Sequence, residues 1–178
     1  MSSSLVGSEM CIRDSFNRAR LIKNSKNRIP YGVDLIQKYR RESWIVFTEN
    51  KKQAKEFNKI INTKGFKSAL YNTDLDSTER LENLNKFKKA DLNVLVTCTA
   101  LDEGFDMPEA DGALILSASS SKRQRVQRMG RVLRITENKP NALIVTVYSS
   151  KTEFDKLMEE AKRYHKEGVP VSWKRQDR

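Results

Sequence analysis

Residues 93–109 read NVLVTCTALDEGFDMPE, an apolar run followed by small hydroxyl and thiol residues and then by a Gly-x-Asp-x-Pro turn. The run from Val94 to Val96 is typical of a strand that is buried on both faces of a parallel sheet. Open α/β sheets bind ligands at the carboxyl ends of their strands, so the turn after this strand is a candidate binding loop. Asp106 and Pro108 taken alone are also compatible with an ordinary structural turn.

Strand-like and helix-like segments alternate along the rest of the chain. Strands are predicted at 44–47, 68–71, 94–97, 113–116 and 142–147. Helices are predicted to begin near Pro30, Asn50, Asp76 and Ser121, and a last helix spans Phe154 to Tyr164. This order predicts an α/β fold in which a mainly parallel sheet carries helices on both faces.

Local signals support these boundaries. Asn50 is a helix N-cap candidate, Asp76 and Glu79 have the spacing of a capping box, and Gly65 is a helix stop. Trp44 and Phe47 are predicted to be core residues rather than surfaces for stacking a base. The helical side chains expected to face the core are Val33, Ile36, Tyr39, Ala54, Phe57, Ile60, Ile61, Leu81, Leu84, Phe87, Phe154, Leu157, Met158, Ala161 and Tyr164.

A basic segment at 127–134 reads QRMGRVLR. On a helix Gln127, Arg131 and Arg134 fall at i, i+4 and i+7, so they point the same way. Arginine suits phosphate because its planar guanidinium donates paired hydrogen bonds and stays charged. Gly130 leaves room for a close neighbour or a ligand. A solvated basic face would carry the same residues, and Arg128 is as compatible with a structural salt bridge as with catalysis.

Taken together, these segments resemble the motifs of superfamily 2 helicases. Residues 93–109 are similar to motif V, 127–134 to motif VI, and Ile45 to Thr48 to motif IV. The form of motif VI, with residues 121–125 before it, is most similar to DNA-repair and restriction-type translocases, including the XPB-like branch. The resemblance covers roughly residues 16–165 and implies a RecA-like C-terminal lobe, a three-layer sandwich.

The resemblance also implies roles for individual residues. ATP would bind between two lobes, where Arg131 and Arg134 would stabilise charge on the γ-phosphate during its transfer. Gln127 would contact the phosphates or couple them to motif V, beside Gly130. Gly104 and Asp106 would lie at the cleft, with Asp106 near the ribose.

Nucleic acid is the expected second ligand, held by loops at the strand ends. Small hydroxyls, amides and backbone N–H groups bind phosphates without reading sequence, which makes Thr48, Asn72, Thr97 and Thr99 candidates. Arg123 and Arg125 are either phosphate contacts or plain surface charges. Many relatives carry threonine where this chain has Cys98, a poor phosphate donor. Gln127 stands where RNA-directed DEAD-box proteins carry histidine, which favours DNA over RNA.

The machinery for a complete ATPase is not in this sequence. None of the seven glycines is followed by Lys-Ser or Lys-Thr, and no acidic box of the Asp-Glu-x-Asp/His type occurs. We therefore expect an N-terminal lobe of a longer protein to hold the triphosphate and Mg²⁺, and this chain to be inactive alone. A non-catalytic module that binds nucleic acid or a partner remains the alternative.

Bulk properties agree with a basic protein that binds polyanions. The net charge is +11 and the pI is about 9.7, while the mean hydropathy of −0.68 and the absence of a long apolar run argue against a membrane span. Cys11 and Cys98 form neither a metal pattern nor a disulfide framework, which favours the cytoplasm. His165 has no partner ligands in the sequence, so no metal site is expected.

The chain divides into four predicted parts. Residues 1–15 match nothing in the helicase pattern and are expected to be a disordered or artefactual tail. Residues 16–41 are expected to form basic linker helices, residues 42–168 the lobe itself, and residues 169–178 a basic tail.

Overall fold

The computed structural model describes residues 14–18, 28–98, 109–116, 142–148, 151–166, 168 and 170–175. Four helices lie in these ranges: α1 (Arg28–Tyr39), α2 (Lys51–Thr63), α3 (Ser77–Lys88) and α5 (Lys151–Lys166). The seven strands are β1 (Asp14–Arg18), β2 (Trp44–Phe47), β3 (Ser68–Leu70), β4 (Val94–Thr97), β5 (Gly112–Ile115), β6 (Leu143–Tyr148) and β7 (Val171–Arg175).

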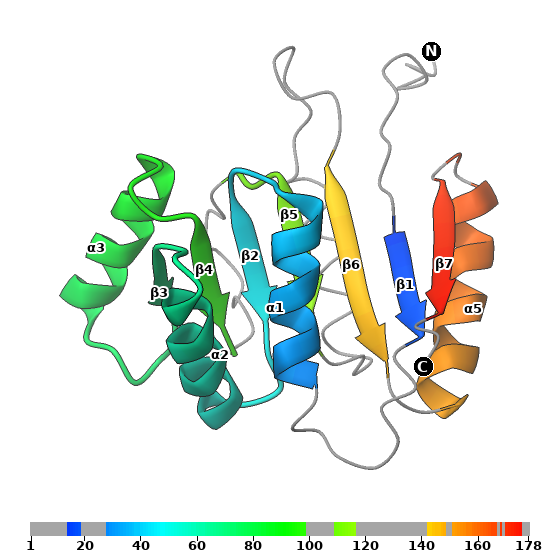
Figure 1. The fold of residues 1–178 in the computed structure, drawn as a ribbon, viewed down its shortest axis with the longest axis horizontal. Helices are drawn as coiled ribbons and strands as arrows, with labels where there is room; N and C mark the ends of the chain where they lie inside the picture. Colours follow the sequence, from blue (N-terminus) through cyan, green and yellow to red (C-terminus); the bar gives the residue numbers. More distant parts are fainter. Residues whose placement is uncertain are drawn as a thin grey trace.

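The strands form one parallel sheet in the order β3-β4-β2-β5-β6-β1-β7 (Figure 1). All six strand pairs are parallel, and β2 lies in the middle of the predicted helicase-like part, with Phe47 opposite both Thr97 and Ile115. The predicted fold class is therefore confirmed. Because the strands all run in the same direction, their carboxyl ends gather at one edge of the sheet, and crossover connections join one strand to the next.

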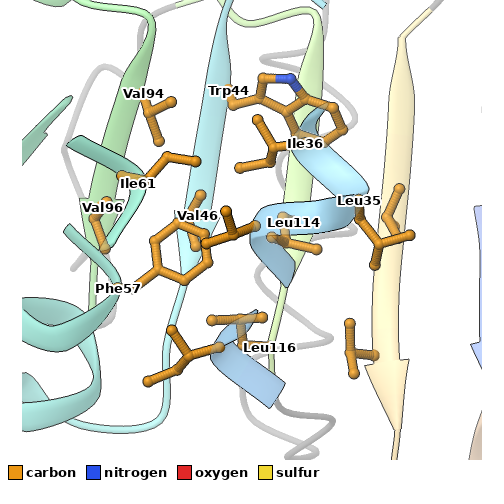
Figure 2. Close-up of a cluster of buried hydrophobic side chains, with 14 of the residues drawn as sticks. Leu35, Ile36, Trp44, Val46, Phe57, Ile61, Val94, Val96, Leu114 and Leu116 are labelled. Atoms are coloured by element: carbon orange, nitrogen blue, oxygen red, sulfur yellow. The ribbon is translucent and has the colours of Figure 1, made fainter. Parts of the chain in front are cut away.

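Alternate residues of the central strands feed two separate cores, because side chains point to opposite faces with a period of two. One core joins Trp44, Val46 and their neighbours to α1 and α2 (Figure 2). The other core joins Ile45, Phe47 and their neighbours to α3 and to Tyr164 of α5. Helices on both faces explain why every residue of β2, β4, β5 and β6 is buried.

Two glycines allow the close packing around the first core. A Cβ on Gly32 of α1 would lie 2.5 Å from Leu116, and a Cβ on Gly112 would lie 2.6 Å from the indole of Trp44. Both distances are below any normal contact, so α1 and β5 approach their neighbours only because these side chains are missing.

The predicted caps are present. The Asn50 side chain accepts a hydrogen bond from the N–H of Gln53 at 2.9 Å, and Asp76 accepts one from Glu79 at 2.8 Å. Gly65 has a φ of +86° just beyond α2, the left-handed conformation that ends many helices. These local patterns set the ends of α2 and α3 where the sequence predicts them.

The predictions for the chain ends need correction. Residues 14–18 form a strand rather than a tail and a linker helix, and 171–175 form a strand rather than a plain basic tail. The cause is tertiary: β1 pairs in parallel with both β6 and β7. Rings of Tyr148, Phe154 and Trp173 pack in series with centroids 5.3 Å apart, which joins α5 to β6 and β7.

Helix α1 is likewise part of the lobe and not a linker. It begins at Arg28, two residues before Pro30, and its buried residues include Val33 and Ile36. One predicted core position is wrong: Leu81 of α3 is 58% exposed, whereas Leu84 and Phe87 are buried as expected. The spacing of Leu81, Leu84 and Phe87 does not show how wide a face of α3 packs on the sheet, and that face is too narrow to include Leu81.

Candidate nucleic-acid interface

Three of the predicted site residues lie in the described part of the chain: Thr48, Asn72 and Thr97. The other predicted positions lie outside the described residues, and their placement remains a prediction: Thr99, Gly104, Asp106, Arg123, Arg125, Gln127, Gly130, Arg131 and Arg134. The described part of the predicted site is therefore the carboxyl edge of β2, β3 and β4.

Thr48 and Thr97 are neighbours at this edge. The N–H of Thr48 donates to the carbonyl of Thr97 at 2.9 Å, which continues the ladder one residue beyond β2. The Thr48 hydroxyl lies 3.2 Å from that carbonyl and 3.2 Å from the carbonyl of Asn50. Both threonine side chains are buried, so the hydroxyl of Thr48 is used to hold the β2–α2 loop.

Asn72 lies beside them, two residues after β3. The N–H of Tyr71 donates to the carbonyl of Val96 at 2.8 Å, which fixes the start of this loop against β4. Asn72 is 2% exposed, and its side-chain oxygen accepts from the N–H of Asp74 at 3.0 Å, forming a local turn. Its amide nitrogen has no hydrogen-bond partner among the described residues. A buried donor left in this state is unusual and marks the position as one where an acceptor would be stabilised.

Charged residues border these three side chains. Lys51 and Lys55 of α2 both form ion pairs with the carboxylate of Asp74; the Lys55 Nζ–Asp74 Oδ2 distance is 3.4 Å. The hydrogen bond from Lys51, with the charge of both lysines, holds the pKa of Asp74 below its ordinary value. Lys51 and Asp74 lie 23 positions apart in the sequence, and no local pattern links them. Only the packing of the loop after β3 against α2 brings the three residues together.

The same loop is anchored on its other side to α3. The guanidinium of Arg80 lies 6.0 Å from the centroid of the Tyr71 ring, and the side-chain amide of Asn83 donates to the carbonyl of Leu70 at 3.1 Å. Burial raises the pKa of Tyr71, and the nearby charge of Arg80 partly opposes that rise. The loop that carries Asn72 and Asp74 is therefore fixed between α2 and α3.

A second charged contact holds the end of β5. Arg28, at the start of α1, donates to the carbonyl of Leu116 at 3.1 Å and to both carboxylate oxygens of Glu153 at 3.0 and 2.8 Å. Leu116 is the last described residue before the segment that holds the predicted motif VI. Arg28 and Glu153 thus connect α1 and α5 to the strand that leads into that segment.

The described residues contain no group of three or more metal-ligating side chains. Within the same part of the chain, no helix is long and apolar enough to pass through a membrane.

The fold and its edge define a RecA-like lobe with a candidate nucleic-acid interface. The family described as Helicase conserved C-terminal domain matches residues 27–136, and the chain belongs to this family. It is the C-terminal lobe of a superfamily 2 helicase, as the motifs in the sequence predict.

Curated relatives come from both DNA and RNA branches. The DNA 3'-5' translocase XPB2 of Sulfurisphaera tokodaii is 35% identical over 129 residues, 72% of this chain and 28% of that protein. UvrABC system protein B of Fusobacterium nucleatum is 30% identical, over 66% of this chain and 19% of that protein. The ATP-dependent rRNA helicase RRP3 of Scheffersomyces stipitis is 23% identical, over 80% and 30%. The chain thus spans less than a third of the length of these relatives.

Solved structures show the same fold. The C-terminal domain of S. cerevisiae Dbp5, a variant form, superposes with a TM-score of 0.72 at 18% identity and covers 94% of this chain and 92% of that chain. E. coli SrmB, a DEAD-box protein, superposes with a TM-score of 0.68 at 16% identity and covers 94% and 91%. Both comparisons support the RecA-like lobe and nothing finer.

Proposed function

We propose that this chain is the second lobe of an ATP-dependent DNA helicase or translocase, which supplies arginines to the ATP site and contacts to the nucleic acid. The observation that carries the proposal is the family match over residues 27–136. That range includes the described carboxyl edge of β2, β3 and β4 and all three predicted motifs. The match supports the class of the lobe, and the residues predicted at the ATP site and at the carboxyl edge support the proposed mechanism.

The residues predicted at the ATP site fit a phosphate by their chemistry. Arg131 and Arg134 offer charged, planar donors, and Gln127 and Gly130 add an amide and an open backbone position. Bound ATP would supply the γ-phosphate whose developing charge the two arginines stabilise. An arginine in this role is worth on the order of 10³–10⁵ in rate. Gly104 and Asp106 would line the same cleft.

The phosphate loop and the Mg²⁺ ligands would come from another lobe of a longer protein. The sequence has no Gly-Lys-Ser/Thr, and curated relatives are several times longer than the matched region. We therefore expect the pure 178-residue chain to hydrolyse ATP no faster than buffer. Magnesium-dependent ATP turnover by the chain alone would contradict the assignment of the phosphate loop and the Mg²⁺ ligands to another lobe.

The nucleic acid would lie across the carboxyl edge, near Thr48, Asn72 and Thr97, with Thr99, Arg123 and Arg125 as further candidates. The buried amide nitrogen of Asn72 supports this placement, because it lacks an acceptor among the described residues. The Thr48 hydroxyl hydrogen-bonds to two carbonyls within the lobe, which favours a role in holding the loop while backbone N–H groups meet the phosphates.

DNA is the proposed substrate rather than RNA. Gln127 and the 35% identity to a protein named as a DNA translocase support this choice. Relatives named as rRNA helicases are less similar, at 23–25%. Binding of labelled single-stranded DNA and RNA of equal length, measured over a series of salt concentrations, tests the choice. Tighter binding of RNA, or a flat salt response to both, would refute it.

The arginine role has its own test in the complete protein. Arg131→Ala should abolish ATP hydrolysis while leaving DNA binding largely intact, because the guanidinium acts on the γ-phosphate of ATP and not on the DNA. Near-normal kcat in this variant would remove the assigned role and would favour a non-catalytic binding module.

A further inference from the structure

An acidic side chain lies within the basic rim of the proposed DNA-binding edge. Lys51 and Lys55 are one turn apart on α2, so both ammonium groups reach the carboxylate of Asp74 in the loop after β3. The side chains of Lys51 and Lys55 are 48% and 61% exposed, and that of Asp74 is 33% exposed. All three are therefore accessible to a ligand that approaches this edge.

This cluster is continuous with the proposed contact residues. Asp74 donates its N–H to the side chain of Asn72, and Lys51 directly follows the N-cap residue Asn50. The carbonyl of Asn50 is in turn a neighbour of the Thr48 hydroxyl, at 3.2 Å. A phosphate placed near Asn72 would thus lie close to two lysines and to the carboxylate that neutralises part of their charge.

We propose that Asp74 is an intramolecular competitor for nucleic-acid phosphate: it holds Lys51 and Lys55 in the free lobe, and a backbone phosphate displaces it. The proposal rests on the proposed function, since it requires the strand to cross this edge. Exposed ion pairs contribute little net stability, so the lysines can change partner at small cost. Release of counterions from the nucleic acid favours the exchange. Asp74 then sets how tightly the carboxyl edge of the sheet binds a nucleic-acid strand.

The test is binding of a fluorescein-labelled single-stranded oligothymidylate to the full chain, measured by anisotropy over a series of KCl concentrations. Asp74→Asn should tighten binding at least about threefold at low salt, because two lysines become available for phosphate. The dependence of log K on log salt should steepen by about 0.7 for each lysine that gains a phosphate contact on a single strand.

Matched variants separate this effect from net charge. Asp91→Asn makes the same charge change at an exposed position before β4, at the opposite edge of the sheet, and should leave binding unchanged. Glu82→Gln frees Lys86 from its ion pair on α3 and should also have little effect. In a chain that carries Lys51→Gln and Lys55→Gln, Asp74→Asn should no longer tighten binding.

A measurement on the unmodified chain guards against a variant that folds poorly. The pKa of the Asp74 carboxyl, followed by carboxyl-detected NMR, should be low in the free chain and should rise toward its ordinary value with saturating oligothymidylate. A purely structural ion pair would keep the low pKa in both states, and that result would overturn the proposal.

The same binding measurement distinguishes a failure of the Asp74 role from a failure of the proposed function. If the unmodified chain binds the oligonucleotide with a steep salt response while Asp74→Asn behaves like Asp91→Asn, the role of Asp74 is refuted and the proposed function stands. If neither the unmodified chain nor any variant binds, the proposed function fails, and the role of Asp74 falls with it.

Discussion

The close contact between Gly112 of β5 and Trp44 predicts that a larger residue at position 112 destabilises the fold. A Cβ on Gly112 would lie 2.6, 2.7 and 2.7 Å from three atoms of the indole six-membered ring. An ordinary contact is at least about 3.4 Å, so Gly112→Ala demands a shift of about 0.8 Å. Trp44 has no exposed surface, and α1 and β4 pack around it, so the ring has nowhere to move (Figure 2).

The size of the effect follows from two opposing contributions. Overpacking a well-filled core costs about 1–3 kcal/mol. Replacing glycine by alanine stabilises by about 0.4–1 kcal/mol through the unfolded chain. We therefore expect Gly112→Ala to lower the free energy of unfolding by about 1–2 kcal/mol. For a chain of this size that corresponds to a fall in Tm of about 2–8 °C.

The assay is urea unfolding of the pure chain followed by far-UV circular dichroism, with Trp44→Leu as the second arm of a double-mutant cycle. Trp44→Leu destabilises by itself, but it removes the ring that the new methyl group meets. Gly112→Ala should therefore cost less in that background, with a coupling of about 1 kcal/mol or more. An equal cost in both backgrounds, or a neutral Gly112→Ala in the wild-type chain, would refute the packing argument.

Three further predictions test the cores and the charged contacts. Phe57→Ala should lower the free energy of unfolding in urea by about 3–5 kcal/mol because the ring is fully buried. Leu81→Ala at an exposed site should change it by less than about 0.5 kcal/mol. Similar losses in the two variants would contradict the assigned core. Burial and nearby negative charges raise the pKa of Tyr31 to about 12 from 10.0, so its stabilising contribution is complete below pH 10 and is lost as the pH rises from 10 toward 12. Tyr31→Phe should flatten that alkaline loss in unfolding measured across this pH range, and an unchanged profile would count against it. Glu153→Gln should lower the free energy of unfolding by about 1.5–3 kcal/mol, because it leaves the partly buried guanidinium of Arg28 without its carboxylate. Glu159→Gln, in an exposed ion pair, should be nearly neutral. The reverse order would show that the Glu153 contact contributes little.

Local sequence signals predicted much of the lobe correctly. The strands at 44–47 and 94–97 and the caps at Asn50 and Asp76 lie where the patterns place them. Each depends on a few neighbouring residues: an apolar run for a strand buried on both faces, and an oxygen three residues before an N–H for a cap. Information of this kind is contained in a short window of the chain.

The motifs also identified the family, because the order and spacing of several short segments are unlikely to coincide by chance. The match over residues 27–136 confirms that identification. The separate roles of Arg131, Gln127 and Asp106 stay predictions, since these residues lie outside the described part of the chain.

Tertiary structure decided what no local pattern carries. Residues 14–18 and 171–175 become strands only because their backbones pair with each other across more than 150 positions of sequence. Pairing of this kind is set by the ladder and by the packing of α5. The local composition of the two segments is mixed, with Phe16, Val171 and Trp173 as the only apolar residues among polar and charged ones.

The charged contacts follow the same rule. The sequence alone determined a basic α/β lobe with helicase motifs and most of its helix ends, because those depend on neighbours along the chain. Only the folded arrangement placed Asp74 against Lys51 and Lys55, and Arg28 against Glu153, because residues 19 to 125 positions apart meet only when parallel strands stack and their connecting helices pack beside them.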